Sequence, residues 1–171
     1  MSSSPRIRLR QPGDNDWPAI LAAAVAALPW AHEANLQWLQ NRQRFDESRG
    51  VRRHYVAEDA SSQKVIGYGA IESDAEPGSF RVFIVTAPEL LATTGEQLYD
   101  RLLMDLQEVG ATKIWAREEA RDTSLLDFFR ARGLAEAERF TSKDGLEIVR
   151  VERAAHGGDR TLCGGTRCSN Y

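Results

Sequence analysis

The feature that most constrains the fold is a strand, turn and helix between residues 80 and 110. The run Phe80–Val85 is β-branched and aromatic and predicts a strand. Pro88 ends it, because proline has no N–H to donate to a sheet. Small residues at 91–95 form a turn, and leucines at helical spacing then predict a helix that stops at Gly110. The free N–H groups of such a helix start suit a pyrophosphate, although an ordinary connection that binds nothing has the same pattern.

Length and charge limit the classes of protein that the chain can belong to. At 171 residues it is long enough for one domain with a proper core. The formal net charge of −3 argues against a broad nucleic-acid-binding face. A nucleic-acid-binding module built on clustered arginines is the weaker alternative, and a steep salt dependence of DNA binding would support it. The charge therefore predicts no nucleic-acid partner. Since no apolar run reaches the length of a membrane span, we also expect no membrane partner and a cytoplasmic protein.

The two cysteines, Cys163 and Cys168, lie close to the C-terminus in a segment rich in Gly, Arg and Ser. Two cysteines separated by four residues provide at most half of a zinc site. The segment shows no hydrophobic periodicity, which is typical of disorder. We therefore predict a domain at residues 1–153, a disordered tail at residues 154–171, and no metal.

Hydrophobic periodicity predicts the remaining elements. Residues 7–9 alternate as a first strand, and two helices follow, the second at about 33–44. Then come a three-strand meander, the central helix, a strand, a helix and a C-terminal hairpin. In the meander Gly67 and Gly69 indicate a bulge or a close backbone approach. The order β-α-α-β-β-β-α-β-α-β-β predicts an α+β fold with a mixed sheet, in which strands 80–85 and 113–117 are parallel.

From Ile7 to Val151 this order resembles the GNAT superfamily of acetyl-CoA-dependent N-acetyltransferases. Val85-x-x-Pro88 is similar to the V-x-P of that family at the end of its central strand. Gly95-x-x-Leu98 is similar to the last glycine of its pyrophosphate loop and the leucine that follows. Residues 122–134 resemble its terminal helix and Gly-Phe. The resemblance implies a GNAT-like fold whose central strand splays away from its parallel neighbour.

The resemblance also implies a function and a set of contacts. It implies transfer of an acetyl group from acetyl-CoA, as co-substrate, to a primary amine of a small molecule or peptide. A backbone N–H of the central strand would polarise the thioester carbonyl. The implied acetyl-CoA contacts come from the strand end, the turn and the later helix: Ile84, Val85, Thr86, Thr93, Thr94, Gly95, Glu96, Gln97, Ser124 and Phe128.

Three positions depart from the family pattern. The basic or amide residue that opens the loop falls at Leu90 or Leu91, and the first loop glycine falls near Thr93. The tyrosine that often protonates the leaving thiolate corresponds to Phe129, which has no proton to give. These departures support a second hypothesis, a degenerate GNAT fold that binds a ligand or partner without catalysis.

The acid and base are less well defined by the sequence. Glu72, at the end of its strand, is the predicted general base, and a solvated strand-end carboxylate is the alternative. Glu118 and Glu119 compete with it, and Tyr68 or Tyr99 could replace the missing acid.

Trp30 and His32, in the link between the first two helices, are predicted to line the acceptor site. The alternative places Trp30 in the core and His32 in water. The acceptor itself is not readable from variable connections of this kind. The splayed strand and the apolar helix faces also make a homodimer plausible.

Overall fold

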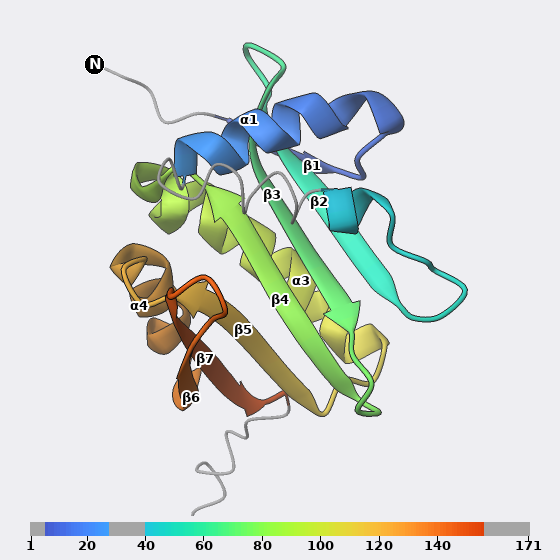
Figure 1. Ribbon diagram of the computed structural model, residues 1–171. Coiled ribbons are helices and arrows are strands. Elements are labelled where there is room, and N and C mark those ends of the chain that lie inside the picture. The colour runs from blue at the N-terminus through green and yellow to red at the C-terminus, as the bar shows by residue number, and fades with distance from the viewer. Residues whose placement is uncertain (1–5, 28–39, 156–171) are drawn as a thin grey trace, which may run out of the picture.

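The chain forms a seven-stranded mixed sheet with helices on both faces (Figure 1). The structure is a computed structural model that describes residues 6–27 and 40–155. The strand order is β1-β2-β3-β4-β5-β7-β6. The strands are β1 Ile7–Arg10, β2 Arg52–Asp59, β3 Lys64–Ser73, β4 Ser79–Thr86, β5 Lys113–Glu119, β6 Ala135–Thr141 and β7 Glu147–Ala154. The helices are α1 Trp17–Ala27, α3 Glu96–Glu108 and α4 Thr123–Ala131, with short turns η1 Asp14–Asp16, η3 Pro88–Leu90 and η4 Leu91–Gly95.

The predicted fold class and mixed sheet are confirmed, with small shifts at element ends. β7 continues to Ala154, beyond the predicted end at Val151. Of the predicted second helix, residues 33–39 lie outside the described part of the chain, and residues 40–43 are helical. The predicted start of the tail at residue 154 is wrong, because Ala154 belongs to β7 and pairs with Lys113. Disorder beyond it remains a prediction, because residues 156–171 also lie outside the described part.

β4 and β5 are the parallel pair of the sheet, and they stay together only at their beginnings. Their register runs from Ser79 opposite Lys113 to Arg81 opposite Trp115 and stops there. Figure 1 shows the two strands diverging beyond this point. The splayed strand is therefore confirmed. Because α3 and α4 follow β4 and β5 respectively, both helices begin near the edge where the strands separate.

The two faces of the sheet carry separate hydrophobic clusters. On one face, Val82 and Ile84 of β4 pack with Leu98 and Leu102 of α3 and with Phe129 of α4. The spacing of the two leucines places them on one face of α3 and explains why this helix lies on the sheet.

α1 covers part of the other face. There Trp17 and Ile20 of α1 pack against Tyr68 of β3 and Phe83 of β4. The sheet is thus covered on one face by α3 and α4 and on the other, in part, by α1.

Both expectations for the glycines of β3 are confirmed. A Cβ atom at Gly67 would lie 3.0 Å from Cγ2 of Thr94 and 3.3 Å from Leu98. At Gly69 it would lie 3.2 Å from Leu102. The absence of side chains there lets α3 approach the sheet closely. The register with β2 also shifts by one residue next to Gly67, which is a bulge.

The segment before α3 differs from the expected open turn. It forms a 3₁₀ turn and then a π-helical turn that runs directly into α3. The N–H of Glu96, expected to be free, donates to the carbonyl oxygens of Leu91 and Thr93. Packing accounts for the difference, because Leu91 and Thr94 are both buried against the core and hold the turn helical.

Candidate active site

The separation of β4 from β5 leaves backbone groups of β4 without a strand partner. The Gly78 carbonyl accepts from the Lys113 N–H at 3.2 Å, so even-numbered residues of β4 direct their polar groups toward β5. Past Arg81 no described strand pairs with β4 on that side. The N–H groups of Ile84 and Thr86 therefore face the gap and are available to a ligand. The backbone of Val85 faces β3 instead, which does not favour it as a backbone contact for the cofactor.

Glu118 is a titratable residue of β5 that lies beyond Trp115, the last residue that pairs with β4. Loss of water around its carboxyl raises the pKa of Glu118 to about 8. The Arg81 guanidinium on β4 lowers that pKa, and the carboxyls of Asp122 and Glu119 raise it further. A carboxyl that titrates near neutral pH can both accept and release a proton, as a general base must.

Glu72, the predicted base, is occupied by an ion pair. Its carboxylate binds the guanidinium of Arg42, and the Glu72 residue is only 5% exposed. A carboxylate held by a buried cation is a poor proton acceptor. The base role of Glu72 remains a prediction, and the geometry favours Glu118.

Two further carboxylates near Glu118 have structural partners. Glu119 pairs with Arg121. Asp122 caps α4, accepting a hydrogen bond from the Leu125 N–H at 3.3 Å. Burial raises the pKa of Asp122, and the Leu125 N–H lowers it. Both carboxylates are therefore engaged by groups of their own segment.

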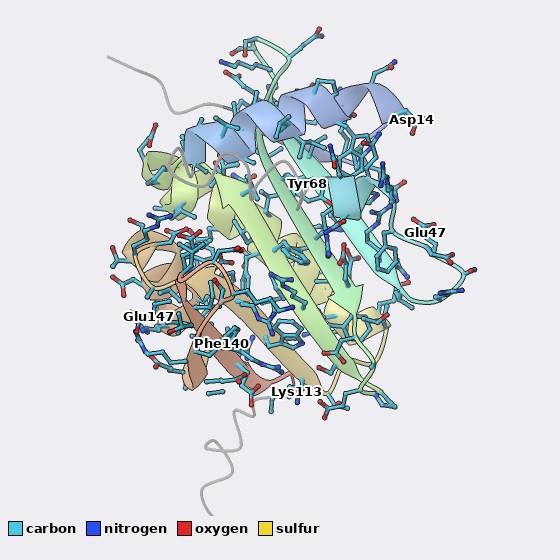
Figure 2. All side chains as sticks on the ribbon, in the orientation of Figure 1. Asp14, Glu47, Tyr68, Lys113, Phe140 and Glu147 are labelled. Atoms are coloured by element: carbon cyan, nitrogen blue, oxygen red, sulfur yellow. The ribbon has the colours of Figure 1, made fainter. Side chains whose placement is uncertain are left out.

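The acid role of Tyr68 or Tyr99 remains a prediction, and the hydroxyl of each lies beside another polar group. Phe129 is fully buried. The centroid of its ring lies 5.6 Å from the ring centroid of Phe128 and 6.4 Å from that of Tyr99. The Tyr99 hydroxyl lies 3.4 Å from a guanidinium nitrogen of Arg153. Tyr68 lies on the α1 face, as Figure 2 shows, and its hydroxyl is 3.2 Å from Nδ1 of His54. Burial raises the pKa of Tyr68.

The predicted acetyl-CoA contacts fall into an exposed and a buried group. Thr93, Glu96, Gln97 and Ser124 are exposed at the starts of α3 and α4. Ile84, Thr86, Thr94, Gly95 and Phe128 are buried, and Val85 is half-buried. The turn before α3 lies against α4, because a Cβ atom at Gly95 would lie 3.4 Å from the Phe128 ring.

The two threonines of the π-helical turn differ in what their hydroxyls can reach. The Thr93 hydroxyl donates to the Leu90 carbonyl at 3.3 Å. The Thr94 hydroxyl is buried and has no hydrogen-bond partner. Thr93 can thus turn its donor to a ligand at the surface, and Thr94 cannot without a local rearrangement.

Comparisons with solved structures identify the architecture. A Desulfovibrio desulfuricans protein assigned to the GNAT family of acetyltransferases superposes with a TM-score of 0.70, at 13% identity, over 88% of this chain and 99% of its own. A ribosomal-protein-alanine N-acetyltransferase from Brucella melitensis gives 0.63, at 21% identity, over 86% and 99%. The spermidine/spermine N-acetyltransferase SpeG from Vibrio cholerae gives 0.62, at 18% identity, over 88% and 93%. This chain has the GNAT fold. No protein-family model matches the sequence, and no curated protein matches it.

Three further predictions concern the acceptor site, metal ligands and membrane spans. Trp30 and His32 lie outside the described residues. Within residues 6–27 and 40–155, no group of three or more His, Cys, Asp or Glu side chains converges as metal ligands would. No helix in the same ranges is long and apolar enough to cross a membrane.

Sequence reasoning missed one residue of the site. Arg81 appears in the sequence as the single charge in an apolar strand, yet it marks the point where the GNAT sheet opens. Only the register of β4 with β5 places it there. The signal available beforehand was its position in the strand predicted to splay.

Proposed function

We propose that the protein is an N-acetyltransferase that moves an acetyl group from acetyl-CoA to a primary amine of a small molecule or peptide. The observation that carries the proposal is the opening between β4 and β5, which combines unpaired N–H groups with a carboxyl that titrates near neutral pH. Solved structures with this fold include enzymes named for spermidine and for ribosomal-protein alanine, whose acceptors are amines.

The residues of the opening supply the steps that amide formation needs. The Ile84 N–H would donate to the thioester oxygen, where negative charge develops. Glu118 would remove the proton from the attacking amine. The nitrogen–carbon bond then forms as the carbon–sulfur bond breaks, and water would protonate the leaving thiolate, because Phe129 has no proton to give.

The start of the helix after β4 would hold the pyrophosphate. Ala92 and Thr93 are exposed there, and Ser124 is exposed at the start of α4. The backbone at a helix start carries partial positive charge, which favours a phosphate. Because Glu96 N–H is already bound within the helix, this contact would rest on residues ahead of it.

The test is thiol release from acetyl-CoA with a panel of primary amines, for the wild type and for Glu118→Gln. We expect the variant to lose about 10²–10⁴-fold in turnover, the typical share of a general base. Glu119→Gln is the matched control, since it removes the neighbouring carboxylate, and it should keep turnover within a few fold. Calorimetry should show that both variants bind acetyl-CoA as the wild type does. Equal turnover in Glu118→Gln and wild type would remove Glu118 from the mechanism.

A second candidate function is a non-catalytic GNAT fold that binds a ligand or partner. The buried Phe129 and the π-helical turn in place of a glycine loop favour it. It predicts no amine-dependent thiol release with any acceptor tested, whether or not acetyl-CoA binds.

A further inference from the structure

An arginine–tryptophan cluster lies on the face of the sheet opposite α3. It consists of Arg81, Trp115, Arg117 and Arg150. The guanidinium carbons lie 5.3, 5.6 and 4.4 Å, respectively, from the centre of the Trp115 ring. Arg117 also lies 5.2 Å from the Phe140 ring, which Figure 2 labels on the hairpin strand β6. Three positive groups thus surround one aromatic surface.

The strand register fixes this cluster. Arg81 is directly opposite Trp115 in the β4–β5 pair, and Arg117 is directly opposite Arg150 in the β5–β7 pair. Trp115 is 7% exposed, and its indole N–H donates to a carboxylate oxygen of Asp74 at 2.7 Å. The ring is therefore a fixed platform, and the guanidinium groups are arranged by the backbone of three neighbouring strands.

The positive charge of the cluster is only partly balanced. Arg150 pairs with Glu152 at 3.3 Å. Asp74 is engaged by Trp115 and by the Ser79 hydroxyl, each at 2.7 Å.

Arg81 and Arg117, in contrast, make no hydrogen bond or ion pair within the described ranges. The Nε atom of Arg81 is buried and has no acceptor. Burial lowers the pKa of Arg81 to about 10, the neighbouring Glu118 raises it, and Arg42 and Arg117 lower it. A buried guanidinium nitrogen that lacks an acceptor favours a bound anion, and Arg117 places an exposed guanidinium over the same ring.

The cluster begins where the proposed reaction would take place. Arg81 is the last residue of β4 that pairs with β5. Its guanidinium is close enough to Glu118 for the two groups to shift each other's pKa. An anion held by Arg81 and Arg117 would therefore lie beside the proposed base.

We propose that the acceptor is a small amine that also carries a carboxylate, such as an amino acid, with that carboxylate bound by Arg81 and Arg117 over Trp115. This proposal rests on the proposed function. A planar guanidinium matches a carboxylate in shape and charge, and an aromatic floor excludes water from the contact. The same charges repel a polycation, so a polyamine is a poor acceptor at this site.

The experiment compares binding of amino acids with binding of their carboxamides, pair by pair, by calorimetry in the absence of acetyl-CoA. Spermidine is the polycationic probe. A hydrogen bond between charged groups predicts that, in each pair whose amino acid binds, the amino acid binds about 10- to 100-fold more tightly than its carboxamide. Arg117→Met should remove most of that preference, and Arg117→Lys should restore part of it. Arg117 is exposed, so both variants should fold.

Arg49→Met is the matched control. The Arg49 side chain is 87% exposed and lies outside the cluster, so this variant should keep the preference.

Four results would each overturn the proposal. They are equal binding of carboxylate and carboxamide, tighter binding of spermidine, no binding of any probe, and an unchanged preference in Arg117→Met. Failure of the proposed function gives a different result. A carboxylate preference without thiol release would support the anion site and contradict the acetyltransferase activity. Thiol release at equal rates with carboxylate and carboxamide acceptors would support the acetyltransferase activity and contradict the anion site.

Discussion

At the residue scale, Glu118 shows how an opening in a sheet changes the chemistry of one carboxyl. Its pKa moves from the ordinary 4.5 to about 8. The folded protein therefore binds more protons than the unfolded chain between these two values. The stability that this group contributes is present below about pH 4.5 and is lost as the pH rises through about 8.

Glu118→Gln should remove this pH dependence. The unfolding free energy of the variant, relative to the wild type, should rise between pH 5 and pH 8 and then level off. Urea denaturation of both proteins at pH 5, 7 and 9 measures it. A constant difference at the three pH values would mean that the carboxyl titrates in its ordinary range.

The Arg42–Glu72 ion pair gives the second residue-scale prediction. The two side chains are 17% and 6% exposed, so Glu72→Gln leaves a largely buried guanidinium without its carboxylate. We expect a loss of about 3 kcal/mol in unfolding free energy, measured by urea denaturation. The double variant Arg42→Met with Glu72→Met should recover much of that loss. If Glu72 is structural, folded Glu72→Gln keeps its rate of thiol release, whereas a loss of about 10²-fold or more would return the base role to Glu72.

At the element scale, the position of α3 depends on the missing side chain at Gly67. A Cβ atom there would also lie 3.2 Å from the Val85 carbonyl oxygen, which is backbone and cannot rotate away. We expect Gly67→Ala to cost about 1–3 kcal/mol in unfolding free energy, because it pushes α3 from the sheet. Chemical denaturation measures the change. Gly13→Ala is the control, since its nearest contact would be an ordinary 3.7 Å, and an equal effect of both variants would contradict close packing at Gly67.

Periodicity and turn residues predict most elements of this chain, because those signals are local. The strands of the meander, α3, α4 and the hairpin at Gly145 follow from spacing and from glycine position. The π-helical turn before α3 could not be predicted, because it depends on the burial of Leu91 and Thr94 against other elements. A local pattern of small residues fits an open turn equally well.

The candidate site was less predictable than the fold, because its chemistry comes from contacts between distant residues. Glu72 appears as a free strand-end carboxylate until the chain brings Arg42 onto it. Glu118 resembles Glu119 in the sequence, and only the surroundings raise its pKa. The arginine–tryptophan cluster needs the register of three strands. The proposed homodimer remains a prediction.

At the scale of the whole molecule, the opening between β4 and β5 joins the two faces of the sheet. The starts of α3 and α4 lie on one side of the opening, and the arginine–tryptophan cluster lies on the other. A cofactor could therefore enter from the helix side and an acceptor from the cluster side. The two would meet at Glu118 and the Ile84 N–H.

Thermal unfolding with and without acetyl-CoA tests the central claim most directly. A ligand at about one hundred times its dissociation constant adds about 2.7 kcal/mol to the unfolding free energy. For a chain of this length that corresponds to a rise in Tm of roughly 5–10 °C. ADP at the same concentration should raise Tm less, because it lacks the arm that reaches the opening. A rise with acetyl-CoA that exceeds the rise with ADP is the predicted result, and an unchanged Tm at saturating acetyl-CoA would contradict the account.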